Sequence, residues 1–235
     1  MSNMFCFQCQ ETAKNTGCTI KGVCGKTADV ANLQDLLMYL CKGISHFTVR
    51  LREMGIENAE VNKFITDSLF MTITNANFDR DRFITRVNQA IDTRDAMRAL
   101  FISKGGNIDD VTFEGAFWSS RDVSVMEQKA TEVGVLATEN EDIRSLRELT
   151  IYGLKGMAAY AEHAFNLGFE NPDIYEFMQK ALVDTTDDSL GAAELTSLVL
   201  ETGAHGVKVM ALLDKANTTA YGNPEITKVN IGVRN

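Results

Sequence analysis

The sequence repeats itself at a fixed offset of 113 positions, because segment 33–72 matches segment 146–185 without an insertion. Leucines, glycines and aromatic residues coincide in the two copies. The matching residues include Leu36 and Leu149, Tyr39 and Tyr152, Lys42-Gly43 and Lys155-Gly156, Gly55 and Gly168, Glu57-Asn58 and Glu170-Asn171, and Phe64 and Phe177. Since helix starts, glycine stops and core positions agree together, the pattern indicates a duplicated three-helix unit rather than chance.

Apolar residues recur every three or four positions between Val30 and Met54, after N-cap candidates at Thr27 and Asp29 and before Gly55. This spacing predicts one amphipathic helix. The same reasoning places the remaining helices at about 58–74, 79–105, 141–167, 171–184 and 190–216.

The predicted fold is therefore mainly all-α, with three-helix bundles at 29–105 and 141–220. The connector between the bundles, 106–140, contains short alternations of apolar and polar residues. We expect a short β-hairpin in this connector, together with a helix around 123–130. Gly43 and Gly156 lie in the middle of predicted helices, where glycine is unfavourable, so we expect close helix packing at both.

The last segment, 221–235, begins with a turn that contains Pro224 and continues with apolar residues at alternate positions from Ile226 to Val233. This alternation predicts a β-strand. A lone strand has no sheet to join, so we expect it to be the start of an α/β domain that is missing from this chain.

Four cysteines lie within segment 1–28, outside any helical pattern: Cys6, Cys9, Cys18 and Cys24, spaced Cys-x2-Cys-x8-Cys-x5-Cys. So many thiols in a short polar segment need a chemical reason, because cysteine is otherwise a buried apolar residue. The first pair can turn two sulfur atoms toward one centre, and the second pair can close the other side. Cys41 lies on the apolar face of a predicted helix and is assigned to packing.

Three kinds of site compete for this loop: an iron–sulfur cluster, a structural zinc ion and two disulfides. Disulfides are disfavoured because the start of the chain does not resemble a signal peptide, which points to a reducing cytoplasm. Five cysteines would also leave one unpaired. Zinc sites more often use two close cysteine pairs or add histidines, whereas the second pair here is spaced by five residues. The irregular spacing favours a cluster, with zinc as the rival.

Other residues of segment 1–28 suit an anionic metal centre. Glycines flank the cysteines and allow the backbone to approach sulfur closely. The apolar side chains expected to exclude water are Phe5, Phe7, Ile20 and Val23. The basic side chains are Lys14, Lys21 and Lys26, so the loop is locally basic. Positive charge would stabilise an anionic cluster and raise its reduction potential.

Composition restricts the partners of the chain. A net charge of -9 and a pI near 4.9, without a clustered basic face, argue against nucleic acid. No apolar run reaches the ~18 to 20 residues that a membrane-spanning helix needs. The sequence contains no nucleophile elbow, phosphate-binding loop or dinucleotide fingerprint, so no catalytic residue is assigned to this chain.

Several motifs occur in the order that is typical of one known family. They are Met4-Phe-Cys-Phe-Gln-Cys-Gln-Glu-Thr, Gly17-Cys-Thr, Gly22-Val-Cys-Gly-Lys, Leu33-Gln-Asp-Leu-Leu, Leu198-Val-Leu-Glu-Thr-Gly and Tyr221-Gly-Asn-Pro-Glu-Ile-Thr-Lys-Val. In these residues the chain resembles the hybrid-cluster, or prismane, protein family, whose members are also called hydroxylamine reductases. The resemblance runs from one end of the chain to the other.

The resemblance implies the first, helical domain of a three-domain cytoplasmic enzyme, distantly related to nickel carbon monoxide dehydrogenases. In that family the first domain carries a cubane cluster. Two α/β domains hold a hybrid iron–sulfur–oxygen cluster that reduces hydroxylamine to ammonia, and reduction of nitric oxide and peroxide is also attributed to the family. By this resemblance Cys6, Cys9, Cys18 and Cys24 ligate a [4Fe–4S] cluster, with [2Fe–2S] or zinc as alternatives.

The ligands of the hybrid cluster in that family lie beyond the end of this chain, so we expect the chain alone to be inactive. Its expected role is electron transfer from a ferredoxin-like or NADH-dependent reductase to the catalytic cluster of the missing domains. The alternative is a non-redox helical interaction module with a structural zinc. Self-association is expected through the face that the missing domains would cover, including 226–233.

Overall fold

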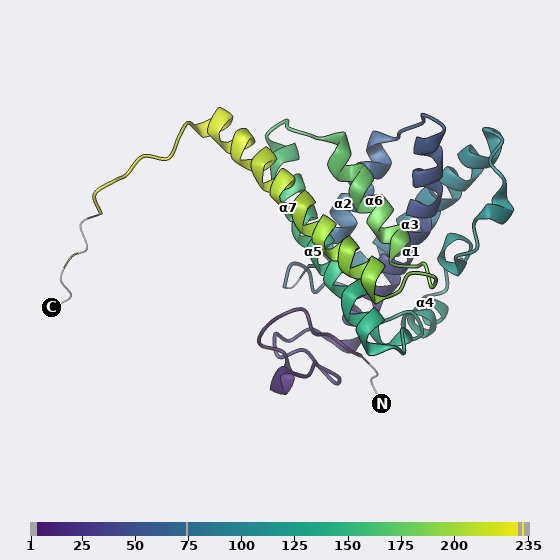
Figure 1. Cartoon of the computed structure of the whole chain (residues 1–235). Coiled ribbons are helices and arrows are strands. Elements are labelled where there is room, and N and C mark those ends of the chain that lie inside the picture. Colours follow the sequence, from purple (N-terminus) through teal and green to yellow (C-terminus); the bar gives the residue numbers. More distant parts are fainter. Residues whose placement is uncertain (1–3, 74, 230–231, 233–235) are drawn as a thin grey trace.

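The computed structural model describes residues 4–73, 75–229 and 232, and it confirms a mainly helical fold (Figure 1). The described residues contain no β-sheet. Their α-helices are α1 (Ala28–Glu53), α2 (Ala59–Met71), α3 (Arg80–Ser103), α4 (Val123–Ala130), α5 (Glu141–Asn166), α6 (Pro172–Asp184) and α7 (Ala192–Tyr221). None of these helices combines the length and the hydrophobicity that a membrane span requires.

The duplication is visible in the helix lengths. Helices α1 and α5 have 26 residues each, helices α2 and α6 have 13 each, and the bounds of both pairs differ by the same offset as the sequence repeat. The side chains of Asn58 and Asn171 cap α2 and α6 by accepting a hydrogen bond from a backbone N–H of the first turn. Gly55 and Gly168 follow α1 and α5 with φ of 75° and 81°, a conformation that favours glycine. Helix α7 continues to Tyr221, five residues beyond its predicted end.

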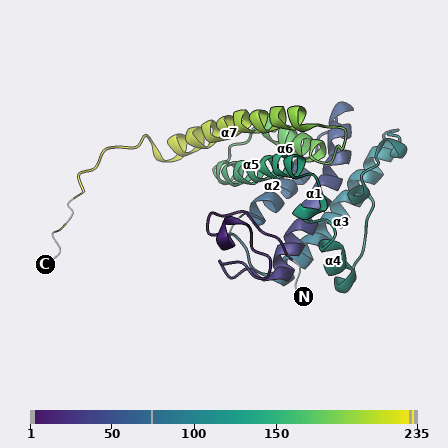
Figure 2. The same ribbon diagram turned by 60° about the horizontal axis from the view of Figure 1, so that its bottom comes forward.

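The two units share one hydrophobic core. Helix α1 packs along α3 and α6, while α5 packs along α7 and α2, so the middle helix of each unit lies against the first helix of the other. Figures 1 and 2 both show α5 and α7 side by side. The core side chains of α1 that are fully inaccessible to solvent are Leu33, Leu36, Leu37, Leu40, Cys41, Ile44 and Phe47.

The β-hairpin predicted in the connector 106–140 is wrong. This segment folds as 3-10 turns at Ile108–Asp110, Glu114–Ala116 and Val135–Ala137 around α4, whose predicted bounds are confirmed. The reason is a fully buried arginine: the guanidinium of Arg94 donates hydrogen bonds to the carbonyl oxygens of Gly115, at 3.3 Å, and Trp118. These backbone groups therefore find partners in a side chain of α3 instead of a second strand.

The strand predicted at 226–233 is not formed in the described part of that segment, because residues 226–229 and 232 belong to no strand. Residues 230, 231 and 233 lie outside the described residues.

The two repeat-related glycines behave differently. A Cβ at Gly43 would lie 2.2 Å from the carbonyl oxygen of Gly115, so the expected close packing is confirmed there, although the partner is a 3-10 turn instead of a helix. Nothing lies within 4 Å of a Cβ at Gly156, so the expectation of close packing is wrong for this residue. The close approach in α5 is one turn earlier, where a Cβ at Gly153 would lie 2.7 Å from Thr202 of α7.

Alanine substitutions at Gly43 and Gly156 should therefore change stability in opposite directions. Gly156→Ala should raise the free energy of unfolding by about 0.5–1 kcal/mol, because it removes glycine from an open helix position. Gly43→Ala should lower it by about 1–3 kcal/mol, because the new methyl group meets backbone that cannot move away easily. Urea unfolding followed by circular dichroism measures both, and destabilisation of equal size in the two variants would contradict the difference in packing.

Candidate metal centre

The N-terminal loop lies at one end of the helices, against the start of α1 and beside α5 (Figure 2). Met4 and Cys18 are buried and pack with Ala31 of α1, which attaches the loop to the helices. The backbones of Cys6 and Cys18 form an antiparallel bridge. In this bridge the N–H of Cys6 donates to the carbonyl of Cys18 at 3.0 Å, and the N–H of Cys18 donates back at 2.8 Å. The fold thus joins the first and third cysteines of the motif.

All four cysteines of the motif carry free thiols. Cys18 is buried, Cys6 and Cys9 are half-buried, and Cys24 is exposed. In residues 4–73, 75–229 and 232, no three cysteine, histidine or acidic side chains lie close enough to hold a metal ion. The structure therefore brings Cys6 and Cys18 together without gathering all four sulfur atoms, and the four-cysteine ligand set stays a prediction. Metal binding and loop folding are commonly coupled in such sites.

The Cys18 thiol has surroundings that favour a thiolate. Burial raises its pKa, but hydrogen bonds with the backbone at Ala13 and Val23 and with the Thr12 side chain, together with the charge of Lys26, lower the pKa below its ordinary value. The Thr12 oxygen lies 3.7 Å from the Cys18 sulfur. Because the thiolate is the form that binds metal, these contacts prepare Cys18 as a ligand.

Among the basic residues of the loop, only Lys26 turns inward. Its side chain is 2% exposed, and its Nζ donates to Gln34 Oε1 at 2.7 Å and lies 4.0 Å from the sulfur of Cys6. Lys14 and Lys21 are exposed. The local positive charge that the sequence suggested is thus concentrated in one buried ammonium group beside a predicted ligand.

The expected exclusion of water is only half correct. Phe5 and Phe7 are half-buried, and their rings stack with centroids 6.1 Å apart. Ile20 and Val23 are 78% and 61% exposed, so in this structure they do not cover the cysteines. They follow Cys18 in the chain, on either side of Gly22, whose N–H donates a hydrogen bond to the Lys26 carbonyl.

Cys41 lies in the hydrophobic core with no exposed surface, which confirms its assignment to packing. Burial raises the pKa of its thiol to about 12. A neutral thiol far from water is a poor metal ligand, so the burial separates Cys41 chemically from the four loop cysteines.

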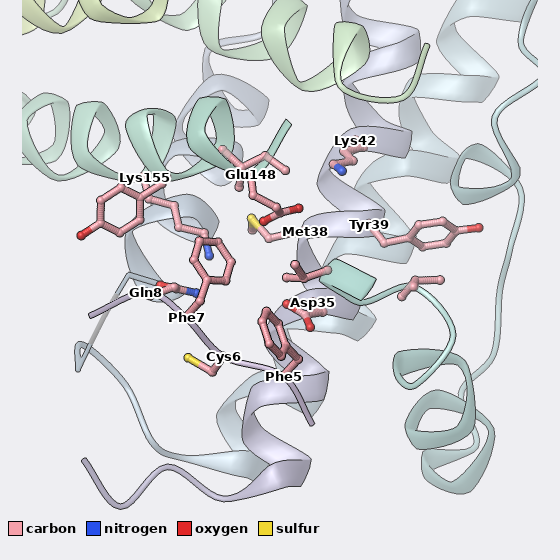
Figure 3. A pocket seen from close by; sticks show the side chains of 14 residues that line it. Phe5, Cys6, Phe7, Gln8, Asp35, Met38, Tyr39, Lys42, Glu148 and Lys155 are labelled. Atoms are coloured by element: carbon pink, nitrogen blue, oxygen red, sulfur yellow. The ribbon is translucent and has the colours of Figure 1, made fainter. Parts of the chain in front are cut away.

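A cavity of about 50 Å³ lies beneath the extended segment 5–8, which carries Cys6, between α1 and α5 (Figure 3). Sequence analysis missed the charged side chains that line it: Asp35 and Lys42 from α1, and Glu148 and Lys155 from α5. Burial raises the pKa of Asp35 to about 7 and raises that of Glu148, and it lowers the pKa of both lysines. No ion pair joins the four groups in the described part of the chain.

The donor set fits a thiolate-ligated metal centre. The loop offers four free thiols, backbone and hydroxyl donors surround Cys18, and a buried ammonium group lies beside Cys6. Hydrogen bonds to sulfur and nearby positive charge are the interactions that stabilise anionic metal–thiolate centres.

Known proteins resemble this chain over almost all of its length. A sequence model of the Prismane/CO dehydrogenase family matches residues 4–235. Proteins named hydroxylamine reductase are 63% identical over 233 residues in Desulfitobacterium hafniense (strain Y51) and 61% identical over 233 residues in Clostridium novyi (strain NT). Each alignment covers 99% of this chain and 42% of the relative, so the chain spans less than half the length of these curated relatives.

Gly17 provides a test of the loop geometry. Its φ is +118°, and a Cβ there would lie 2.5 Å from the ring of Phe5, next to Cys6. Gly25 has a similar φ of +96° with open space around it. Both alanine variants carry backbone strain, but only Gly17→Ala should displace Phe5. We expect about tenfold or faster amide exchange at Cys6 and Cys18 in Gly17→Ala alone. Equal exchange rates in the two variants, measured by NMR, would contradict this packing.

Proposed function

This chain belongs to the Prismane/CO dehydrogenase family, and from that membership we propose that it is the electron-transfer part of a hydroxylamine reductase. In this proposal the loop holds a [4Fe–4S] cluster through Cys6, Cys9, Cys18 and Cys24. The observation that carries the proposal is the set of four free thiols on one loop, in a chain whose relatives are named hydroxylamine reductase.

When bound, such a cluster supplies one-electron transfer. The residues around it have separable tasks. The Cys6–Cys18 bridge holds two ligands on adjacent backbones, and Lys26 places a cation beside Cys6. The stacked rings of Phe5 and Phe7, on either side of Cys6 in the chain, cover the cavity beneath the loop. No role as an acid, base or nucleophile is proposed for these residues.

The reaction proposed for the longer protein consumes two electrons and two protons: hydroxylamine accepts them, its N–O bond breaks, and ammonia and water are released. Nitric oxide or peroxide reduction is proposed as a further activity of the longer protein. The reaction would take place at a hybrid cluster that this chain does not bind. The chain's own task is to accept single electrons from a ferredoxin-like or NADH-dependent reductase and pass them to that cluster.

The partner of the helical face is proposed to be the remainder of the longer protein. Helix α7 exposes large apolar side chains: Leu200, Val207, Met210 and Tyr221. Exposed apolar surface of this kind commonly marks a contact surface. Without that cover the chain should self-associate, which sedimentation at increasing concentration would detect.

Metal analysis tests the cluster. The anaerobically purified chain should be brown, bleach with dithionite and contain about four irons and four sulfides per chain. Cys9→Ser should lose the colour and most of the iron, since one ligand of four is gone. Cys41→Ala is the matched control, because it removes a cysteine outside the loop and should retain the cluster.

Each other metal content has its own meaning. Zinc without iron or sulfide would contradict the redox proposal and make the loop part of a non-redox interaction module. About two irons per chain would indicate a [2Fe–2S] cluster. Equal iron in Cys9→Ser and the parent chain would remove Cys9 from the ligand set.

The chain alone should form no ammonia from hydroxylamine with a reduced viologen as electron donor, because no catalytic cluster is bound. The control is a full-length hydroxylamine reductase under the same conditions. Ammonia formation by the 235-residue chain at a comparable rate would contradict the division of tasks between this chain and the remainder of the longer protein.

A further inference from the structure

The charged cavity beneath Cys6 is built from the same positions of the two repeats. Helix α1 contributes Asp35, Met38, Tyr39 and Lys42, and helix α5 contributes Glu148, Ile151, Tyr152 and Lys155. Each residue of α5 lies 113 positions after its counterpart in α1. The duplication therefore brings two copies of one acid–lysine pattern to a single cavity, with residues 5–8 laid across it (Figure 3).

The two lysines of this cavity have different contacts. Lys155 is 4% exposed, and its Nζ lies 3.4 Å from the Thr72 carbonyl oxygen. With its amide oriented to satisfy both ends, Gln8 accepts from Lys155 Nζ at 3.0 Å and donates to the same Thr72 carbonyl at 3.2 Å. Lys155 thus links the side chain of Gln8, which lies between Cys6 and Cys9 in the chain, to α5 and to the residue that follows α2.

Lys42 faces the same cavity from the other helix, but on the side away from Cys6 (Figure 3). The charges that act on Lys42 belong to Glu148, Arg147 and Asp35, all on helices. Cys6 is among the groups whose charge acts on Lys155. The two lysines that correspond in the repeat therefore have different neighbours, and of the two only Lys155 lies under the segment that contains Cys6.

We propose that Lys155, contributed by the second repeat, is a positioning residue of the metal centre. It anchors the segment between Cys6 and Cys9 through the side chain of Gln8 and sets the reduction potential by its buried positive charge. The inference rests on the proposed function. A buried cation interacts strongly with nearby charge because the surrounding protein screens it poorly. Since reduction adds negative charge to a cluster, a cation beneath its ligands stabilises the reduced state.

The experiment compares Lys155→Gln with Lys42→Gln in the 235-residue chain. Glutamine keeps a polar, hydrogen-bonding side chain and removes one positive charge from the same cavity in each variant. Lys155→Gln should lower the equilibrium constant for one-electron reduction about tenfold or more, which is a shift of ~59 mV to lower midpoint potential. Lys42→Gln should shift it by less than half as much. Anaerobic spectroelectrochemistry measures both, and equal shifts or an unshifted Lys155→Gln would overturn the proposal.

Amide hydrogen exchange provides a second measurement that needs no cluster. In the metal-free proteins, Lys155→Gln should speed amide exchange at Cys6 and Cys18 at least tenfold, because the anchored segment contains Cys6, whose backbone forms the bridge with Cys18. Lys42→Gln should leave both rates unchanged. This measurement decides the matter if Lys155→Gln loses iron, and unchanged exchange in that variant would then overturn the proposal. Loss of the fold or of iron in both variants alike would also overturn it, because the role would then belong to the whole cavity.

The outcomes separate this inference from the function on which it rests. A wild-type chain that binds no iron would refute the proposed function. The comparison of amide exchange in the two variants would still decide whether Lys155 anchors the segment that contains Cys6. An iron-loaded wild type with equal potentials in both variants would refute the role of Lys155 and leave the cluster in place.

Discussion

Burial of the apolar faces of α1 and α5 in one shared core is the interaction on which the rest of the structure depends. Full burial of a leucine, isoleucine or phenylalanine stabilises a fold by about 1.5–3 kcal/mol relative to leaving it exposed, and α1 alone buries Leu33, Leu36, Leu40, Ile44 and Phe47 completely. Because α2 packs on α5 and α6 packs on α1, neither repeat can complete this core by itself. The duplicated units therefore form one body, and the cysteine loop rests against it.

The same arrangement places charges where apolar packing alone would not. Asp35 and Lys42 on α1 and their counterparts on α5 line the cavity beneath the segment that contains Cys6. Among the described residues, these four groups form no ion pair with one another. Burial of such groups is unfavourable unless they interact with other charges or polar partners. Lys155 has two such polar partners, the Thr72 carbonyl and the side chain of Gln8. Gln8 lies between the predicted ligands Cys6 and Cys9. The proposed metal centre would thus rest on both repeats.

The loop and the helices differ in how firmly they are held. The core helices bury most of their apolar side chains, whereas Cys24, Ile20 and Val23 are exposed. Such a distribution is expected where folding of a ligand loop is coupled to metal binding. The loop thus has an anchored part around the Cys6–Cys18 bridge and an exposed part around Cys24.

The sequence by itself determined the helices, the duplication and the family, because periodic apolar residues, Asn58 and Asn171 caps and glycine stops act locally and recur at one offset. The cysteine spacing also identified a candidate metal loop. Tertiary structure alone decided which elements meet. The connector became turns because Arg94 of α3 donates to two of its carbonyl groups, and Gly43 and Gly156 diverged because only Gly43 faces backbone. Lys155 likewise came to contact Gln8, between Cys6 and Cys9, because the N-terminal loop packs against α5, and no local pattern encodes that contact.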